Sequence, residues 1–189
     1  MPFAYEAAPN ELCLRQGELL RGVWLYSATT ARELAEGAQV GFSAVKHELV
    51  VPLNADCDLY WDHHQRFVAD EPANESHPRL VPFVFLCGAY TEPEIRGREG
   101  VNKDVWRKMT ANQDERYHHF PAASIGNPPA GNLPELILDF KKTYCIPTSA
   151  LYDGIGNGIA RVAMIPPVYL HDLMQRFYSF HARVALPEL

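Results

Sequence analysis

Three carboxylates and two imidazoles follow an apolar run within the segment 50–64. The carboxylates belong to Asp56, Asp58 and Asp62, and the imidazoles belong to His63 and His64. Such groups are costly to bury without partners, so a segment that gathers them is solvated, hydrogen-bonded or arranged around a ligand. This segment is therefore the first candidate site.

The spacing of the aspartates suits a divalent metal ion. If a strand continues through Asp58, Asp56 and Asp58 share one face; if a helix starts there, Asp58 and Asp62 share a face. Two close carboxylates raise each other's proton affinity, and a cation relieves this repulsion. Oxygen ligands favour Mg²⁺ or Mn²⁺, and the adjacent histidines extend the choice to Zn²⁺ or Fe²⁺. In the alternative, Asp56 or Asp58 caps the following backbone through an Asx turn while Asp62, His63 and His64 face water.

A second cluster of acidic, basic and cationic residues occupies the segment 112–119. Arg116 is suited to binding phosphate or carboxylate, and His118 to general acid or base catalysis if its pKa lies near neutrality. In the alternative, Arg116 pairs with Asp114 or with a carboxylate of the first cluster. We expect the two clusters to meet on one face of a small sheet.

Cys57 is a further candidate, because it lies between two aspartates. A cysteine nucleophile needs a nearby histidine, and His63 or His118 would supply one. The four cysteines of the chain are widely separated and include no Cys-x-x-Cys pair. We therefore interpret them as reduced thiols rather than zinc ligands or disulfides.

Length and composition indicate one ordinary globular domain spanning residues 1–189. The chain has 47% hydrophobic and 21% charged residues and a formal net charge of -6, which disfavours broad attraction to nucleic acid or anionic membranes. Residues 1–6 lack the basic segment and apolar core of a signal peptide, and no apolar run is long enough to cross a bilayer. We expect a cytoplasmic protein that does not associate with membranes.

The elements that must position these residues are mostly strands. Apolar runs and alternation predict strands at 16–27, 42–53, 80–90, 117–120, 136–144 and 159–165. Helices are predicted at 29–36 and 101–111, and loops at 70–78 and 121–134. The strand 136–144 should place Leu136, Leu138 and Phe140 on one face and Ile137 and Asp139 on the other.

A final helix opens at Pro166-Pro167 and carries an apolar seam. The seam consists of Leu170, Leu173, Phe177, Phe180 and Val184. We expect it to pack on the chain's own sheet, and a homodimer through this helix is the alternative. Asp172 and Arg176 should form an exposed i,i+4 ion pair. The fold class is α+β: a small, mainly antiparallel SH3-like barrel or curled sheet with inserted short helices and a C-terminal helix.

Several motifs together resemble a group of small bacterial proteins with no assigned activity. They are Asp56-Cys57-Asp58-Leu59, Asp114-Glu115-Arg116-Tyr117-His118, Asp139-Phe140-Lys141, Arg176-Phe177 and Arg183-Val184-Ala185-Leu186-Pro187. This resemblance covers most of the chain from about Gly17 onward. It implies a bacterial cytoplasmic protein in a mobile or defence-associated gene setting, and it assigns no catalytic residue.

The order of the strands at 16–19, 50–54 and 83–88 is similar to the SH3-like barrel of the PemK/MazF toxin endoribonucleases. This resemblance implies a fold. The toxins carry an Arg-Pro pair where this chain has Lys46-His47, and a Thr or Ser that the segment 83–88 lacks. Ribonuclease activity is therefore not carried over.

These observations lead to two hypotheses about function. The first is a binding or accessory module that recognises nucleic acid or a protein partner through the face carrying both clusters. The alternative is a metal-dependent hydrolase or nuclease in which Asp56, Asp58 and Asp62 hold the metal, His118 transfers a proton and Arg116 steadies a phosphate.

Overall fold

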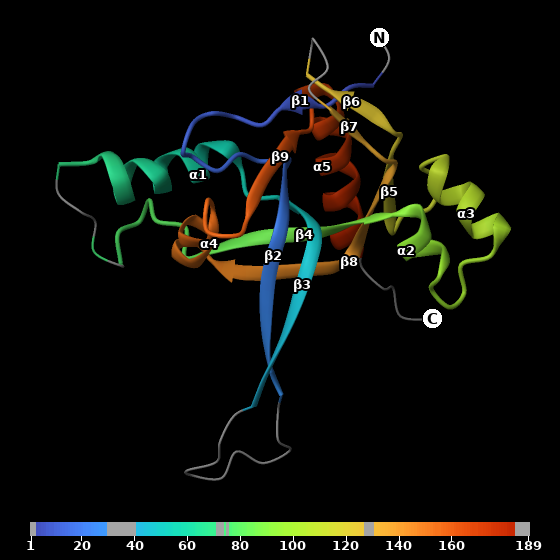
Figure 1. Ribbon diagram of the computed structural model, residues 1–189, viewed down its shortest axis with the longest axis horizontal. Helices are drawn as coiled ribbons and strands as arrows, with labels where there is room; N and C mark the ends of the chain where they lie inside the picture. Colours follow the sequence, from blue (N-terminus) through green and yellow to red (C-terminus); the bar gives the residue numbers. More distant parts are fainter. Residues whose placement is uncertain (1–2, 30–40, 71–73, 75, 127–130, 184–189) are drawn as a thin grey trace, which may run out of the picture.

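The computed structural model describes residues 3–29, 41–70, 74, 76–126 and 131–183. This part of the chain forms a seven-stranded sheet, a two-stranded sheet and five α-helices (Figure 1). The strands are β1 (Glu6–Ala7), β2 (Glu18–Thr29), β3 (Gly41–Pro52), β4 (Phe83–Thr91), β5 (Tyr117–Phe120), β6 (Ala123–Ile125), β7 (Gly131–Leu133), β8 (Leu136–Pro147) and β9 (Ala160–Met164). The helices are α1 (Asp56–His63), α2 (Glu92–Arg96), α3 (Lys103–Thr110), α4 (Thr148–Gly154) and α5 (Pro167–His181), and a π-helical turn, η1 (His64–Val68), continues α1.

The large sheet is antiparallel and open. Its strand order is β1-β9-β2-β3-β4-β8-β5, so β1 and β5 form its two edges. Every neighbouring pair of strands in this order runs antiparallel. The α+β class and the mainly antiparallel sheet are confirmed. The barrel is not, because the sheet does not close on itself.

The strands lie close to where the apolar runs predict them. Strand β4 lies inside the sheet, between β3 and β8. Its apolar residues at successive positions, which point to both faces of the sheet, indicate such a place. Strand β8 alternates as expected: Leu136, Leu138 and Phe140 lie in one core cluster, and Ile137 lies in another. The 12-residue length of β8 exceeds the predicted strand because its outer half continues to pair with β4.

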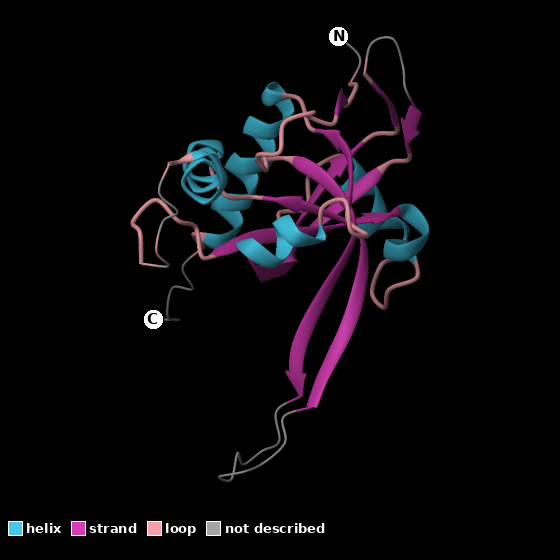
Figure 2. Cartoon of the chain, turned by 60° about the vertical axis from the view of Figure 1, so that its left-hand side comes forward, coloured by secondary structure: helices cyan, strands magenta, loops and turns pink. Residues whose placement is uncertain are grey.

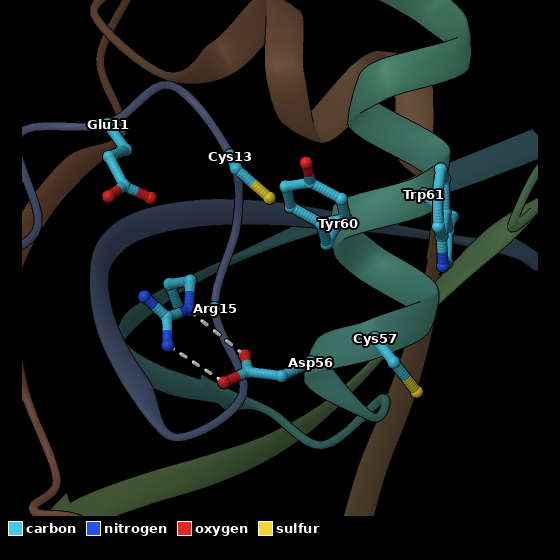
Figure 3. A pocket seen from close by; sticks show the side chains of 7 residues that line it. All are labelled: Glu11, Cys13, Arg15, Asp56, Cys57, Tyr60 and Trp61. Carbon is cyan, nitrogen blue, oxygen red and sulfur yellow. Dashed lines mark hydrogen bonds and ion pairs between the residues drawn. The ribbon is translucent and has the colours of Figure 1, made fainter.

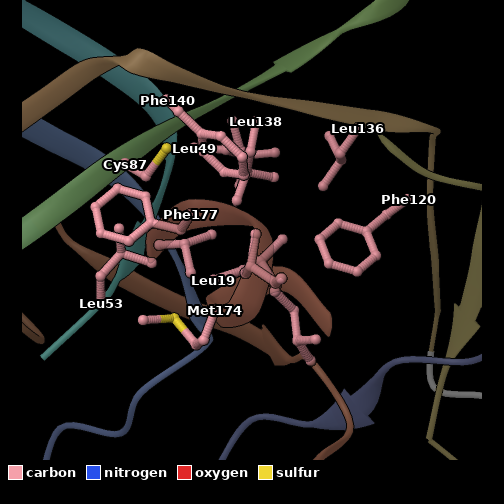
Figure 4. Close-up of a cluster of buried hydrophobic side chains, with 14 of the residues drawn as sticks. Leu19, Leu49, Leu53, Cys87, Phe120, Leu136, Leu138, Phe140, Met174 and Phe177 are labelled. Carbon is pink, nitrogen blue, oxygen red and sulfur yellow. The ribbon is translucent and has the colours of Figure 1, made fainter. Parts of the chain in front are cut away.

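The main hydrophobic core lies between one face of the sheet and helix α5 (Figure 4). The helix buries Leu173, Met174, Phe177 and Phe180. The ring of Phe177 lies 5.5 Å from that of Phe140 on β8, in an edge-to-face arrangement. The predicted packing of the C-terminal seam on its own sheet is confirmed through Phe180, and Val184 lies outside the described residues.

A second core cluster covers the opposite face of the sheet. Successive strand residues alternate between the two clusters, as Val50 and Val51 on β3 do. Helix α1 contributes Leu59 to the second cluster, and α4 contributes Leu151. Helices α2 and α3 pack beside β5 through a third, smaller cluster that includes Met109.

The hairpin of β2 and β3 extends well beyond the rest of the sheet (Figure 2). Strand β9 pairs with β2 only along Glu18–Arg21, and β4 pairs with β3 only along Val50–Pro52. Beyond these residues the hairpin is a two-stranded ribbon. Gly22, at the start of this ribbon, has a φ of 81°, a left-handed conformation that favours glycine.

Local structure departs from prediction at several places. Strand β3 does not continue through Asp58, because Asn54 takes over the pairing with β4: its Oδ1 accepts from the Phe85 amide at 2.6 Å. Helix α1 therefore begins at Asp56. The loop predicted at 121–134 contains β6 and β7, and α2 and α4 were not predicted. The helix predicted at 29–36 lies outside the described residues, apart from its first residue, which ends β2.

Candidate functional site

Asp56 ties the start of α1 to the loop that precedes β2. Arg15 donates from Nε and Nη2 to the two carboxylate oxygens, at 3.2 and 3.0 Å. The backbone N–H of Gln16 donates to Oδ1 at 2.7 Å. The hydrogen bond with Asp56 raises the pKa of the Arg15 guanidinium. Asp56 thus accepts a backbone hydrogen bond, but from a distant loop rather than from the turn that follows it.

Asp62 is fully buried and anchors a different segment. The Nε atom of Arg66 lies 3.0 and 2.9 Å from its two oxygens, and the Val81 amide donates to Oδ1 at 2.7 Å. Arg66 also donates to the Val81 carbonyl at 3.2 Å. A buried carboxylate requires such partners. Asp62 therefore fixes α1 to the chain just before β4.

The structure does not bring the three aspartates of the predicted metal site together. Asp58 is exposed, and its carboxylate lies 3.7 Å from the thiol of Cys57. Asp56 and Asp62 are engaged by different arginines. Within the ranges that the structure describes, no group of three or more His, Cys, Asp or Glu side chains is arranged to hold a metal ion.

The second cluster is organised around the buried carboxylate of Asp139. This residue was predicted on the face of β8 opposite Phe140. Arg116 donates from Nε and Nη2 to the two oxygens of Asp139, each at 2.7 Å, and Arg98 donates at 2.9 Å. Asp139 has no exposed surface. Asp114 instead accepts the backbone N–H of Arg116 at 3.0 Å. The Arg116 side chain thus pairs with Asp139 rather than with Asp114 or the first cluster.

His118 is buried beneath α5 rather than placed in an open site. Burial lowers its pKa to about 3, so the imidazole is neutral at physiological pH. Its Nδ1 has no hydrogen-bond partner among the described residues, and its Nε2 lies 4.0 Å from the Asp172 carboxylate. Arg176 does not form the expected exposed pair with Asp172, because its guanidinium donates to three backbone carbonyls at 2.8 Å.

The expectation that the two clusters meet is wrong. Figure 1 shows α1 and β5 on opposite sides of the molecule, with the central strands between them. The reason lies in the sheet order, in which β4 and β8 separate β3, the strand before α1, from β5 at the edge. The two clusters cannot form one site.

Helix α1 and the turn η1 expose their aromatic side. Tyr60, Trp61, Phe67 and Val68 are all more than 40% exposed, while Asp62 on the other side is fully buried. The rings of Tyr60, Trp61 and half-buried His64 are neighbours, and Phe67 and Val68 follow on the π-helical turn η1. We call this set, Tyr60, Trp61, His64, Phe67 and Val68, the aromatic stripe.

Helix α1 buries Leu59 and Asp62 on its inner side and leaves its aromatic side chains outward, whereas an ordinary surface helix buries most of its apolar side chains. The buried ion pair of Asp62 and Arg66 fixes this orientation of α1. The sequence carries the periodic signal, but periodicity alone would predict that the stripe is buried. This is why sequence analysis did not identify it.

A shallow groove of about 400 Å³ adjoins the stripe (Figure 3). Its lining residues are Glu11, Cys13, Arg15, Asp56, Cys57, Tyr60 and Trp61. Burial raises the pKa of the Cys13 thiol, which keeps it protonated at neutral pH. No hydrogen bond joins Cys57 to a histidine in the described part of the chain, and its role as a nucleophile stays a prediction.

Charges around the stripe are balanced or slightly negative. Arg15 and Arg66 are paired with aspartates. Arg79 lies over the Trp61 ring, 4.2 Å from its centroid. Glu11 and Asp58 add exposed carboxylates beside the groove. The stripe and its groove therefore form an aromatic surface without excess positive charge.

No known family model, curated protein or solved structure matches this chain. The fold and the exposed surface define an α+β protein with an open antiparallel sheet and an aromatic helix face. Among the described residues, no helix is long and apolar enough to cross a membrane.

Proposed function

We propose that this chain is a protein-binding module whose contact surface is the aromatic stripe with its adjoining groove. The observation that carries the proposal is the orientation of α1, which buries Asp62 and exposes Trp61 and Phe67. Each large aromatic side chain buries about 150–250 Å² when covered. A helix held with this face outward is well suited to cover a partner.

The composition of the stripe matches that of energetically important interface residues. Trp and Tyr dominate such positions, and here Tyr60 and Trp61 lie side by side with ring centroids 5.4 Å apart. The buried pair of Asp62 and Arg66 holds the helix rigid beneath them. Less side-chain and backbone freedom is then lost on binding.

The charge balance favours a protein over nucleic acid. Nucleic acid binding rests on uncompensated Lys and Arg that contact phosphates. Around the stripe, Arg15 and Arg66 are paired with aspartates, and the exposed carboxylates of Glu11 and Asp58 outnumber the single charge of Arg79. We therefore infer a partner with an apolar contact segment flanked by Lys or Arg.

The alternative of a metal-dependent hydrolase receives less support. It would require Asp56 to exchange Arg15 for a metal ion, and Asp62 to give up Arg66 and the Val81 amide. The bacterial origin, the cytoplasmic location, the defence-associated setting and the SH3-like relationship stay predictions from the resemblances given above.

Photo-crosslinking in the native cells tests the proposal. A benzophenone amino acid is placed at Phe67 in the stripe or at Tyr178 on α5, which are equally exposed at 57% and 58%. We expect a discrete protein adduct from position 67 that position 178 does not give. Equal adducts at both positions, or an adduct with RNA or DNA at position 67, would contradict the proposal.

A further inference from the structure

The ribbon formed by β2 and β3 has an edge that no strand covers. Beyond Arg21, the side of β2 that faces away from β3 has no strand neighbour among the described residues. The sequence 22–29, Gly-Val-Trp-Leu-Tyr-Ser-Ala-Thr, contains no charged residue and no proline. Natural edge strands usually carry such residues to prevent pairing with another chain.

Three large apolar or aromatic side chains on this ribbon are exposed. Trp24 is 49% exposed, Tyr26 is 72% exposed, and Val45 on β3 is 54% exposed. An isolated two-stranded ribbon is only marginally stable in water. A further strand beside β2 would extend it into a wider sheet and cover part of this apolar surface.

Charge indicates which kind of strand fits. Within the segments 22–29 and 41–49, the only Lys, Arg, Asp or Glu residues are Lys46 and Glu48, which pair with each other at 3.5 Å. The whole chain has a net charge of -6, so two copies repel each other over most of their surfaces. The ribbon is a neutral region where two copies can approach.

The sequence of the β2 edge is also self-complementary. An antiparallel pair of β2 strands related by a two-fold axis at Leu25 places Trp24 opposite Tyr26 of the partner subunit, and does so twice. Directly opposed aromatic side chains are favourable cross-strand pairs. The same residues thus serve both halves of a symmetric contact.

We propose that two copies of this chain associate through their β2 edges, antiparallel about a two-fold axis at Leu25, to form a four-stranded ribbon. This dimer uses neither α5, whose seam is buried in the chain's own core, nor the aromatic stripe of α1. It therefore leaves both stripes available for a partner.

Sedimentation velocity from micromolar to sub-millimolar concentration tests association. We expect a concentration-dependent dimer for the native chain and a monomer for the double variant Trp24→Lys with Tyr26→Lys, since the added charges face each other across the axis. The matched variant Tyr60→Lys with Trp61→Lys, on the stripe, should keep the dimer. A native chain that is monomeric throughout, or a dimer that survives the β2 substitutions, would overturn the proposal.

Disulfide trapping tests the register. In a background of Cys57→Ser and Cys145→Ser, which removes the exposed thiols, Leu25→Cys places two thiols on residues directly opposite each other, with Cα atoms about 4.5–5.5 Å apart. Tyr26→Cys places them on residues about 8 Å apart, beyond the reach of a disulfide.

If side-chain exposure alone decided the cross-linking, Tyr26→Cys would give more covalent dimer than Leu25→Cys, because position 26 is more accessible than half-buried position 25. We expect mild oxidation to give a covalent dimer from Leu25→Cys and little from Tyr26→Cys. Equal or greater cross-linking at position 26 would exclude this register.

Discussion

Among single residues, Asp62 shows how a carboxylate that sequence marks as reactive becomes structural. It is fully buried, and each of its oxygens faces Nε of Arg66. Asp139 has the same role at the other end of the sheet, with Arg98 and Arg116. In both cases the guanidinium groups neutralise the charge that would otherwise attract a cation.

Replacing Asp62 should therefore affect stability. Asp62→Asn removes the charge that Arg66 neutralises, and Arg66 is only 21% exposed. We expect the free energy of unfolding to fall by about 3 kcal/mol, the lower end for a broken buried pair. Urea denaturation measures it.

Asp58→Asn on the same helix provides the control. Because Asp58 is exposed, its replacement should change the free energy of unfolding by less than about 0.5 kcal/mol. Equal effects of the two substitutions would show that the buried pair does not stabilise α1.

His118 should make stability depend on pH. Burial lowers its pKa to about 3 in the folded chain, whereas an unfolded histidine has a pKa of about 6.5. The unfolded state therefore takes up a proton first as the pH falls. The contribution of His118 is fully present above pH 6.5 and is lost as the pH falls from there toward 3.

The measurement compares the native chain with His118→Phe, which keeps an aromatic ring at this position but has no titratable group. Well below pH 6.5, the native chain should lose about 1.4 kcal/mol more per pH unit than the variant. Urea titrations at pH 7 and pH 5 give this difference, which also cancels the titration of the carboxylates. Parallel pH profiles would contradict the burial of a neutral His118.

Sequence identifies the types of these residues but not their partners. The acidic and basic clusters are visible in the chain, yet Arg15 reaches Asp56 across 41 positions and Arg116 reaches Asp139 across 23. Such pairs depend on the sheet order. A prediction made from local spacing therefore grouped Asp56 with Asp62, which the fold assigns to different arginines.

Among the elements, α5 is the one that sequence describes best. Its apolar gaps of three and four residues, opened by Pro167, predict both its start and its buried face, and Phe177 and Phe180 are buried as expected. The alternative of a homodimer through this seam is disfavoured, because the sheet already covers it.

Phe177→Ala should lower the free energy of unfolding by about 3–5 kcal/mol, because it leaves a cavity beside Phe140 and Phe85. Tyr178→Ala, one residue along and 58% exposed, should have little effect. Thermal or urea unfolding of the two variants checks this difference. A small loss for Phe177→Ala would mean that α5 is not a principal part of the core.

Other elements could have been predicted more completely. The side chains of Thr91 and Glu94 form a capping box at the start of α2, a signal that is readable in the sequence. The orientation of α1, in contrast, cannot be predicted from its own sequence. Its aromatic stripe is exposed while Leu59 and Asp62 are buried on the opposite side, and the place of Asp62 depends on the Val81 amide from a separate segment.

For the whole molecule, the structure presents two exposed apolar regions at different places, the stripe on α1 and the ribbon of β2 and β3. The buried carboxylates of this acidic chain are matched by arginines. The carboxylates therefore have little tendency to bind cations, and the arginines have little tendency to bind phosphates.

A metal titration tests this balance. Since Arg15 and Arg66 occupy the carboxylates of Asp56 and Asp62, calorimetric titration with Mg²⁺ or Mn²⁺ should give no saturable binding. Saturable binding that is lost in the double variant Asp56→Asn with Asp58→Asn would instead support the metal-dependent hydrolase.

The most direct test of the protein-binding surface compares two tryptophans of similar exposure, Trp61 on the stripe at 41% and Trp24 on the ribbon at 49%. The measurement is the calorimetric affinity of the purified chain for the protein identified by cross-linking at Phe67. Trp61→Ala should weaken binding about 30-fold or more, as for a central interface residue, while Trp24→Ala changes it less than about twofold. Equal affinities for the native chain and Trp61→Ala would contradict the account.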